Sequence, residues 1–398
     1  MIKKAGIFVL VVALFLVSLG PTLVQAQGGL TILASSAEAE FPAKLSFNLS
    51  AKSNVDITDI RLNYSVDYES FAQVTSEVYI EFVPDTNVDI TWDLDMVKVG
   101  GLPPGAGLEY WWTVKDASGE KSQTAPTEVR FDDNRYSWRS LTKEKVTIYW
   151  YEGEQSFAEE LMSAAQQALA RLAEETGAYL KRSVKMYIYA NSQDLQGAMI
   201  YPQEWTGGVA FTRYGIIAIG IGQSNLLWGE RSIGHELTHL VIHQMTFNPY
   251  ISLPTWLDEG LAMYTEGTLG VGFVDYLNNA IEGNSLISAR SLSSPFSAYS
   301  SQATLSYAES YSLVEFLITN YGQSKMLELL TTFSEGSSYD GALKKVYGFD
   351  MDGLDTLWRD YVGKHYQNAG VIIEAASPAP IGTLTKLATQ TYTREWNW

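Results

Sequence analysis

The stretch from Arg231 to Leu240 reads Arg-Ser-Ile-Gly-His-Glu-Leu-Thr-His-Leu and lies in a segment with helical periodicity, at about residues 230–245. It contains the pattern His-Glu-x-x-His. Two histidines four residues apart lie one turn apart on the same face of a helix, so both imidazoles can point at one ion. Three of the four histidines of the chain, His235, His239 and His243, fall in this helix. The stretch therefore predicts a metal site.

A second stretch offers a third ligand. Twenty residues after His239 comes Glu259, within Thr-Trp-Leu-Asp-Glu-Gly-Leu-Ala at residues 255–262. Pro254 favours the start of a helix here, so a short helical hairpin would bring Glu259 to the two histidines. A catalytic zinc ion has three protein ligands and one position open to water. The chain contains no cysteine, which leaves only histidine and carboxylate ligands. The sequence predicts one zinc ion per chain, bound by His235, His239 and Glu259.

Glu236 lies between the histidines but cannot coordinate from the same helix face. It is predicted to lie beside the open position, where it would take a proton from the attacking water and pass it to the leaving amine. The alternative is a surface helix with scattered histidine and glutamate residues. A five-residue motif can match by accident. Glu259 argues against accident here, because its spacing from the histidines completes a metal site.

These residues resemble the gluzincin metallopeptidases, and in particular the bacterial peptidase MA-like families. Glu259 has the same separation from the second histidine as in thermolysin-like enzymes. Trp-Leu-Asp-Glu-Gly-Leu-Ala at residues 256–262 is similar to the Trp-Leu-Asn-Glu-Gly-Phe-Ala of alanyl-aminopeptidase-like enzymes. The resemblance covers about residues 145–365. It implies a zinc ion, a β-sheet edge that lines the cleft, and hydrolysis of peptide bonds.

The chain departs from these families at two places. Thermolysin-like enzymes carry an acid four residues after the ligand glutamate to orient a histidine, and Met263 occupies that position here. The group that orients the histidine must therefore come from elsewhere. The related aminopeptidases bind the free amine through a Gly-x-Met-Glu-Asn strand, whereas the corresponding segment here, Gly207–Phe211, lacks the glutamate. We therefore expect an endopeptidase.

The segment Ser-Tyr-Ala-Glu-Ser-Tyr at residues 306–311 resembles the Tyr-Glu-Lys-Gly helix that bears the catalytic tyrosine of aminopeptidase-like enzymes, with Tyr307 at the matching position. The resemblance implies that Tyr307 donates a hydrogen bond to the oxyanion. Tyr311, one turn later, is the alternative donor. Both tyrosines are also consistent with the aromatic face of a core helix.

Two further residues near the motifs have open interpretations. His243 has two possible roles. As a fourth metal ligand it would make a closed structural site, and otherwise it is a partly buried histidine next to the ligands. Asp258 either accepts a hydrogen bond from a ligand histidine or is an acidic residue favoured at a helix N-terminus.

Residues 28–135 predict an all-β region. Apolar residues alternate with polar ones in several separate runs, for example from Leu45 to Leu49, from Ile60 to Val66 and from Leu108 to Val114. Pro103-Pro104-Gly105 and Asp116-Ala117-Ser118-Gly119 predict turns between the strands. The region resembles an immunoglobulin-like or fibronectin type III module, which implies a β-sandwich.

Residues 1–26 resemble a secretory signal peptide, with Lys3 and Lys4, an apolar run and Val24-Gln25-Ala26. An uncleaved anchor is the alternative. With the signal removed, we expect no stable membrane span.

The chain has 27 basic and 45 acidic residues and a formal net charge of −18. Such a charge disfavours nucleic acid and anionic lipid as partners. Residues 367–398 show little periodicity, and we expect them to form a tail.

The sequence thus predicts a signal peptide (1–26), a β-sandwich (28–135), an α+β gluzincin domain (140–366) and a tail (367–398). The expected protein is a secreted or cell-surface zinc metallopeptidase that cleaves peptides or proteins. One rival is a cell-surface binding protein with a vestigial peptidase domain, and another is a zinc amidohydrolase that acts on cell-wall material. The sequence does not define the oligomeric state.

Overall fold

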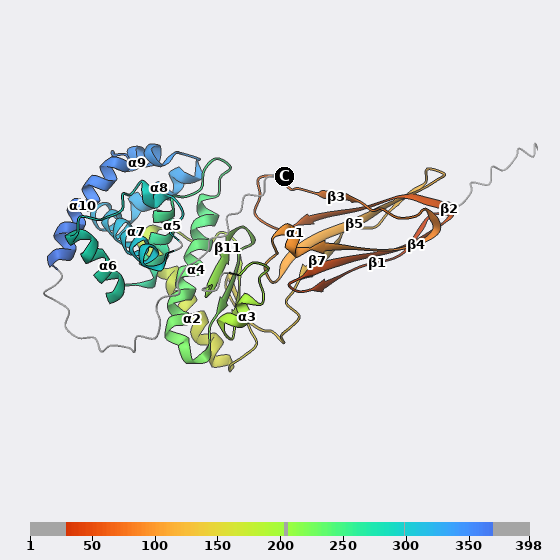
Figure 1. Ribbon diagram of the computed structural model, residues 1–398, viewed down its shortest axis with the longest axis horizontal. Helices are drawn as coiled ribbons and strands as arrows, with labels where there is room; N and C mark the ends of the chain where they lie inside the picture. The colour runs from red at the N-terminus through yellow and green to blue at the C-terminus, as the bar shows by residue number, and fades with distance from the viewer. Residues whose placement is uncertain (1–28, 203–205, 298, 369–398) are drawn as a thin grey trace, which may run out of the picture.

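The computed structural model describes residues 29–202, 206–297 and 299–368. The predicted signal peptide and almost all of the predicted tail lie outside these residues. The chain has a β-rich N-terminal region and a largely helical C-terminal region, and a small sheet lies between them (Figure 1). This arrangement confirms the predicted order of a strand-rich part followed by a helical part.

Seven hydrogen-bonded strands make up the N-terminal region, together with the single-turn helix α1 (Met96–Val99). The strands are β1 (Thr31–Glu40), β2 (Lys44–Val66), β3 (Ser76–Tyr79), β4 (Asp85–Asp95), β5 (Ala106–Asp116), β6 (Lys121–Gln123) and β7 (Thr127–Phe131). Alternate residues along them are buried, as the sequence predicts. Leu108, Tyr110, Trp112 and Val114 of β5 are each at most 2% exposed, whereas their neighbours are more accessible.

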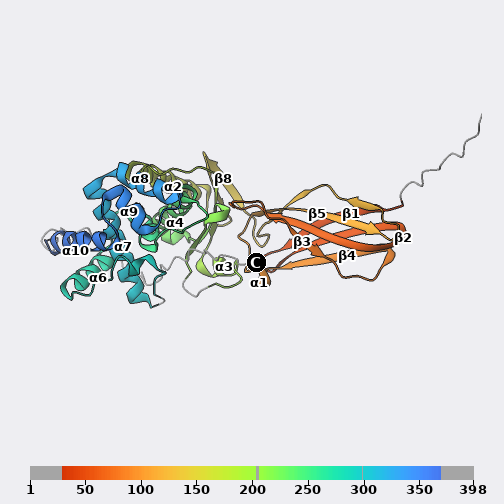
Figure 2. The ribbon, with the colours of Figure 1, turned by 90° about the horizontal axis from the view of Figure 1, so that it is seen from above.

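The long strand β2 belongs to two groups of strands. Its first part pairs with β1 and β4 over residues 44–52, and its last part pairs with β3 and β5 over residues 57–66. The pairing registers shift between Lys52 and Ile57. The sequence predicts two separate strands here, and the chain instead runs through both groups without a turn. In Figure 2 the region extends away from the rest of the molecule as an elongated unit.

The second sheet has five strands in the order β11-β12-β10-β9-β8. They are β8 (Arg139–Lys143), β9 (Val146–Trp150), β10 (Val184–Tyr189), β11 (Gly208–Phe211) and β12 (Ile216–Gly220). Strands β9, β10 and β12 are parallel, and β8 and β11 run antiparallel at the two edges. Among the described strands β11 pairs only with β12, so one of its edges is unpaired.

Both faces of this sheet are buried, but against different partners. Met186 and Ile188 of β10 belong to the core that the helices form. Tyr187 and Tyr189 point to the other face and pack into the core of the N-terminal β region. Because successive side chains of a strand point to opposite faces, one strand joins both cores. The N-terminal region is therefore packed directly on the sheet that carries the helical part.

The principal helices are α2 (Gln155–Thr176), α3 (Ser192–Gln196), α4 (Leu226–Thr246), α5 (Thr255–Glu266), α6 (Val271–Glu282), α7 (Ser300–Tyr321), α8 (Gln323–Ser334), α9 (Tyr339–Tyr347) and α10 (Met351–Asn368). Helical periodicity at residues 156–176, 230–245, 254–265, 306–321, 324–334 and 353–365 predicts α2, α4, α5, α7, α8 and α10, of which α7 begins six residues earlier than predicted. The sequence does not predict α3, α6 or α9. Pro254 precedes α5 as its N-cap and is not its first residue. None of the described helices is long and apolar enough to cross a membrane.

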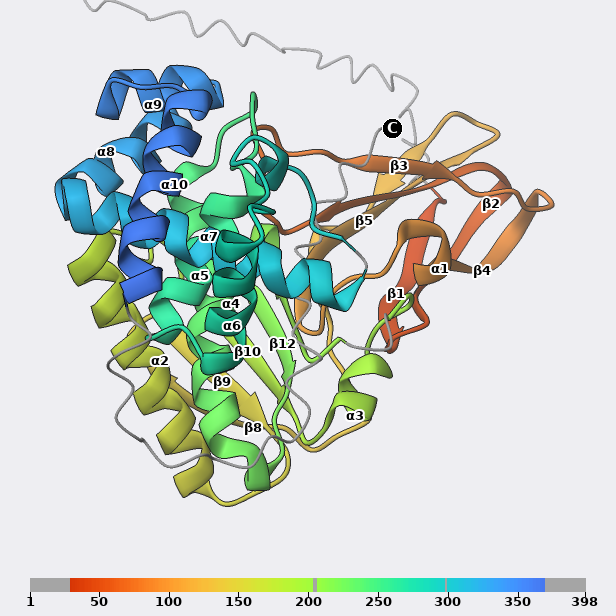
Figure 3. The ribbon, with the colours of Figure 1, turned by 60° about the vertical axis from the view of Figure 1, so that its left-hand side comes forward.

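Helix α4 lies at the centre of the C-terminal region, against the sheet on one side and against α2 and α5 on others (Figure 3). From Ser232 to Ile242 every residue is buried. A helix that is buried all round has no purely solvent-facing side, so its polar residues must find partners within the protein. The polar residues of this segment include His235, Glu236 and His239.

Candidate metal centre

Helices α4 and α5 bring together the three predicted ligands. His235 and His239 lie one turn apart on α4, and Glu259 lies in the second turn of α5. Nε2 of His235 is 3.5 Å from Oε2 of Glu259, and Nε2 of His239 is 3.6 Å from the same oxygen. The three side chains are at most 5% exposed. The helical hairpin expected from the sequence therefore forms and joins the two motifs.

The geometry of these three residues fits a metal ion. Ligand atoms about 2.1 Å from a tetrahedral zinc ion are roughly 3.4 Å apart, which is close to the two distances found here. Nε2 of His239 and Oε2 of Glu259 are buried and have no hydrogen-bond partner among the described residues. A buried polar atom without a partner is costly, and a bound cation would remove that cost. The three side chains form a His-His-acid group of the kind that holds a metal.

The opposite nitrogen of each histidine ring faces a carboxylate. Nδ1 of His235 donates to Oε1 of Glu266 at 2.7 Å, and Nδ1 of His239 donates to Oδ1 of Asp258 at 2.9 Å. Such partners fix the ring orientation, and Nε2 of each ring faces Oε2 of Glu259. Glu266 was missed in the sequence, although it lies on the same helix as Glu259 and seven residues later, at a spacing of two turns. It replaces the acid that is absent at Met263.

His243 is not a ligand for the same ion as the other two histidines. Its Nε2 lies 2.9 Å from Oδ2 of Asp258, whose other oxygen holds His239. Asp258 therefore bridges two histidines, and it is also the acidic residue in the first turn of α5. His239, His243 and Asp258 also form a possible metal group by distance. Their close pairs at 2.9 Å are hydrogen bonds, since ligands around one zinc ion lie farther apart.

The electrostatics of the site favour positive charge. Burial alone would lower the pKa of His235, but its hydrogen bonds with Glu259 and Glu266 outweigh burial and raise the pKa well above 6.5. The pKa of His239 is also raised, because the charges of Asp258 and Glu259 outweigh the effect of its burial. Three carboxylates thus surround two imidazoles in a dry interior. A divalent cation would supply the charge that this cluster lacks.

Glu236 lies beside the edge strand β11. A Cβ atom placed on Gly208 would lie 2.8 Å from Oε1 of Glu236, so the glycine leaves room for this carboxylate. Oε2 of Glu236 is buried and has no hydrogen-bond partner among the described residues. Burial raises the pKa of Glu236 to about 7, although the charges of His235 and His239 oppose this effect. A carboxylate with such a pKa is suited to accept and return a proton near neutral pH.

Tyr307 and Tyr311 lie outside the His-His-Glu group, on the neighbouring helix α7. Both are buried, and both pack around Met263, which is one turn beyond Glu259 on α5. The ring of Tyr307 meets Phe296 edge-on at 5.1 Å, and Tyr311 lies 5.6 Å from Tyr264. Gly260 allows α5 to approach α7, because a Cβ there would be 2.4 Å from the carbonyl oxygen of Ser310. The tyrosines are therefore near neighbours of the ligand helix.

Solved structures show only distant likeness to this chain. OgpA from Akkermansia muciniphila, in a catalytically inactive form with an O-glycopeptide, is 11% identical over 27% of this chain and 30% of its own length, with a TM-score of 0.20. A two-domain M1 zinc metallopeptidase variant bound to L-arginine is 13% identical over 84% and 94%, with a TM-score of 0.37. Aminopeptidase A of Legionella pneumophila with aspartic acid is 11% identical over 83% and 50%, with a TM-score of 0.36. The chain thus spans about a third of the first structure and half of the third.

No curated protein matches the chain. A sequence model of the Peptidase MA superfamily does match it, from residue 164 to residue 364, which is half of the chain. The matched segment contains α4, α5 and α7, and with them every residue of the site described above. It also agrees with the resemblance that the two motifs carry. The chain belongs to the Peptidase MA superfamily.

Proposed function

We propose that the protein is a zinc-dependent endopeptidase in which His235, His239 and Glu259 hold the ion and Glu236 is the general base. The single observation that carries the proposal is the convergence of three buried ligand atoms within 4.8 Å of one another, next to a buried glutamate that is not one of them. Two histidines and one carboxylate are a common ligand set for catalytic zinc. When bound, zinc would activate a water molecule and polarise the substrate carbonyl.

Glu236 carries the proton transfer in this proposal. Its carboxylate takes a proton from the attacking water and returns it to the amine of the leaving group. Burial supports this role, because a carboxylate in a dry site holds a proton more readily than one in water. Gly208 supports it too, since any larger residue would displace the carboxylate. Tyr307 is our proposed donor to the oxyanion, and Tyr311 is the alternative.

Internal cleavage is proposed because β11 offers no carboxylate to an ammonium group. The strand consists of Gly-Val-Ala-Phe at residues 208–211, and a 3-10 turn at Thr212–Tyr214 follows it. Peptides with acetylated and free N-termini provide the test, and both should be cleaved at the same internal bond. A strict requirement for the free amine would show an aminopeptidase instead.

The division of roles within the site can be tested with two variants. Glu236→Gln should retain zinc and lose most turnover, because it removes the base and no ligand. Glu259→Gln should lose zinc during dialysis, because it removes a ligand. Elemental analysis and cleavage of a quenched fluorescent peptide measure the two properties. If both variants keep their metal and their activity, the proposal is wrong.

We also propose the domain boundaries 28–135 and 140–366, with an immunoglobulin-like or fibronectin-like module in front. The group β1-β2-β4 and the group β3-β2-β5 with β6 and β7 support this assignment, because such modules consist of two groups of antiparallel strands. Secretion after removal of residues 1–26 is part of the proposal. The mass of the protein recovered from the medium of expressing cells tests it.

A further inference from the structure

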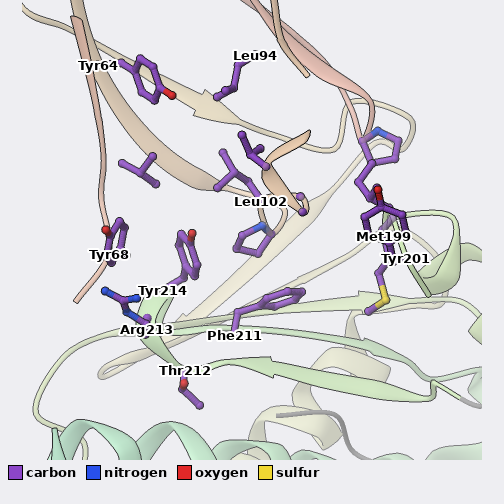
Figure 4. Close-up of a pocket in the computed structure, with 18 of the residues that line it drawn as sticks. Tyr64, Tyr68, Leu94, Leu102, Met199, Tyr201, Phe211, Thr212, Arg213 and Tyr214 are labelled. Atoms are coloured by element: carbon purple, nitrogen blue, oxygen red, sulfur yellow. The ribbon is translucent and has the colours of Figure 1, made fainter. Parts of the chain in front are cut away.

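A pocket of about 360 Å³ lies between the N-terminal β region and the five-stranded sheet (Figure 4). Its walls come from several segments of the chain. They are strands β2 and β4 with the loop after β2, the turn at residues 99–103, the segment at residues 198–201, and residues 211–214 at the end of β11. A pocket of this volume is at the lower end of the range for small-molecule sites and is large enough for one bulky side chain.

The pocket lies at one end of the strand that passes the catalytic glutamate. Gly208 at the start of β11 abuts Glu236, and Phe211 at its end lines the pocket. Ala210 packs with the helices, whereas Phe211 packs with the core of the β region. The pocket is therefore on the face of β11 that is opposite to Glu236. Since a strand advances by about 3.3 Å per residue, the pocket begins about 10 Å from the glycine.

The lining is apolar with a few polar groups. Aliphatic side chains such as Leu94, Leu102 and Met199 form much of it. The hydroxyl groups of Tyr64 and Tyr214 point into the space (Figure 4). Hydroxyls in an apolar cavity can bind the polar groups of a ligand. Arg213 contributes a cation beside the pocket.

The two sides of the pocket are held together by contacts of the loop after β2 with the C-terminal part of the chain. Arg213 donates from Nε to the carbonyl oxygen of Glu69 at 3.1 Å, and its guanidinium lies 4.3 Å from the ring centre of Tyr68. Glu69 also forms an ion pair with Arg182. Phe71 stacks on Phe247, just beyond α4, with ring centres 4.1 Å apart. These contacts fix the loop after β2 on the catalytic part, so the pocket is preformed.

We propose that this pocket binds a large apolar side chain of the peptide substrate, about three to five residues from the bond that is cleaved. The inference rests on the proposed peptidase function and adds a substrate preference to it. A peptide that pairs with the unpaired edge of β11 would direct alternate side chains to the two faces of the sheet. The peptide side chains that point away from α4 would face the N-terminal β region. The first of these peptide side chains beyond Phe211 would enter the pocket.

This occupant agrees with the chemistry of the lining. The aliphatic and aromatic walls match an apolar side chain, and the hydroxyls of Tyr64 and Tyr214 match the backbone groups of an extended peptide. Continuity of the pocket with β11 favours a substrate residue over a separate ligand, because the same strand borders the base and the pocket. The N-terminal β region would thus take part in substrate selection.

The test uses blocked peptides that share one cleaved bond and differ in the position of a single phenylalanine in a serine- and glycine-rich background. Binding is measured by fluorescence anisotropy on the full-length Glu236→Gln protein loaded with zinc, so that no peptide is consumed. Phenylalanine at one position, about three to five residues from the cleaved bond, should tighten binding roughly 10- to 100-fold over serine. The wild-type protein should show the same preference in kcat/KM.

Two variants that fill the pocket complete the test. Leu102→Trp, or Met199→Trp from a different wall if the first does not fold, should abolish the preference and leave binding of the serine peptide unchanged. Leu357→Trp is the matched control, because Leu357 lies on α10 and is 43% exposed. Equal binding at all positions, or a preference that survives Leu102→Trp, overturns the inference even if peptides are cleaved. Selective binding without any cleavage by the wild type would support the pocket and contradict the proposed peptidase activity.

Discussion

Oε1 of Glu266 lies 2.7 Å from Nδ1 of His235, two turns of α5 beyond Glu259. One helix therefore supplies both a proposed metal ligand and the carboxylate that orients another ligand. Asp258, on the same helix, orients His239. The register of α5 on α4 thus sets the positions of all three groups at once. A small rotation of α5 would disturb the ligand Glu259 and both orienting acids together.

Glu266→Gln should lower the affinity for zinc by about 10- to 100-fold while the fold is retained. The amide keeps the shape of the side chain but removes the negative charge that favours a correctly oriented His235. Competition with a chromophoric chelator measures the affinity. Glu282→Gln, at an exposed position of α6, is the control and should bind zinc like the wild type. Equal affinity for both variants would contradict the orienting role.

Gly208→Ala should reduce kcat by roughly 100-fold with zinc content unchanged. The new methyl group would lie 2.8 Å from Oε1 of Glu236 and 3.3 Å from Cδ1 of Ile219, so the carboxylate must move. Gly272→Ala on α6 is the matched control, because no atom lies within 4 Å of its new Cβ. Steady-state kinetics and elemental analysis would decide the question. Normal turnover in Gly208→Ala would place the base elsewhere.

Tyr307→Phe should reduce kcat by about 100-fold at constant zinc content if its hydroxyl stabilises the oxyanion. The ring and its packing on Phe296 and Met263 are kept, so stability should change little. Tyr311→Phe is the paired variant, since Tyr311 packs around the same methionine. A loss of activity in Tyr311→Phe alone would transfer the role to that residue. Near-normal turnover in both variants would assign the two tyrosines to packing.

The free energy of unfolding of the wild type should fall as the pH rises, and Glu309→Gln should make this fall smaller. Glu309 on α7 is fully buried and accepts hydrogen bonds from the backbone nitrogen of Ile287 at 3.1 Å. Burial raises its pKa from 4.5 to about 8, although the hydrogen bond from Ile287 and the charge of Arg359 oppose this. Between these pH values the folded protein holds one proton more than the unfolded chain. Its contribution to the free energy of unfolding is therefore complete below pH 4.5 and is lost as the pH rises to about 8.

The measurement for Glu309 is urea unfolding of metal-free wild type and Glu309→Gln at pH 5 and pH 8. The wild type should lose up to about 4 kcal/mol more than the variant between the two pH values. Glu282→Gln again serves as the exposed control. Parallel losses in all three proteins would show that Glu309 titrates normally.

The secondary structure was predictable where periodicity was long and clear. The buried strand β5 and the helices α2, α4 and α7 follow directly from the spacing of apolar residues. Helix α6 was missed because Gly270 and Gly272 flank its start and disfavour a helix on local grounds. In β2 the predicted break does not occur. The shift of register between Lys52 and Ile57 replaces a turn and lets one strand serve two groups.

The sequence by itself predicted the proposed ligands, because His235 and His239 are related by the geometry of one helix and Glu259 follows on the next. The spacing of residues along the chain is sufficient to recognise such a pattern. Glu266, the room that Gly208 leaves for Glu236 and the pocket behind β11 depend on how separate elements pack. The orientation of α5 on α4 and of the β region on the sheet arises from burial of apolar surface spread over the whole chain. Burial is non-directional, so only the folded structure decides which side chains meet.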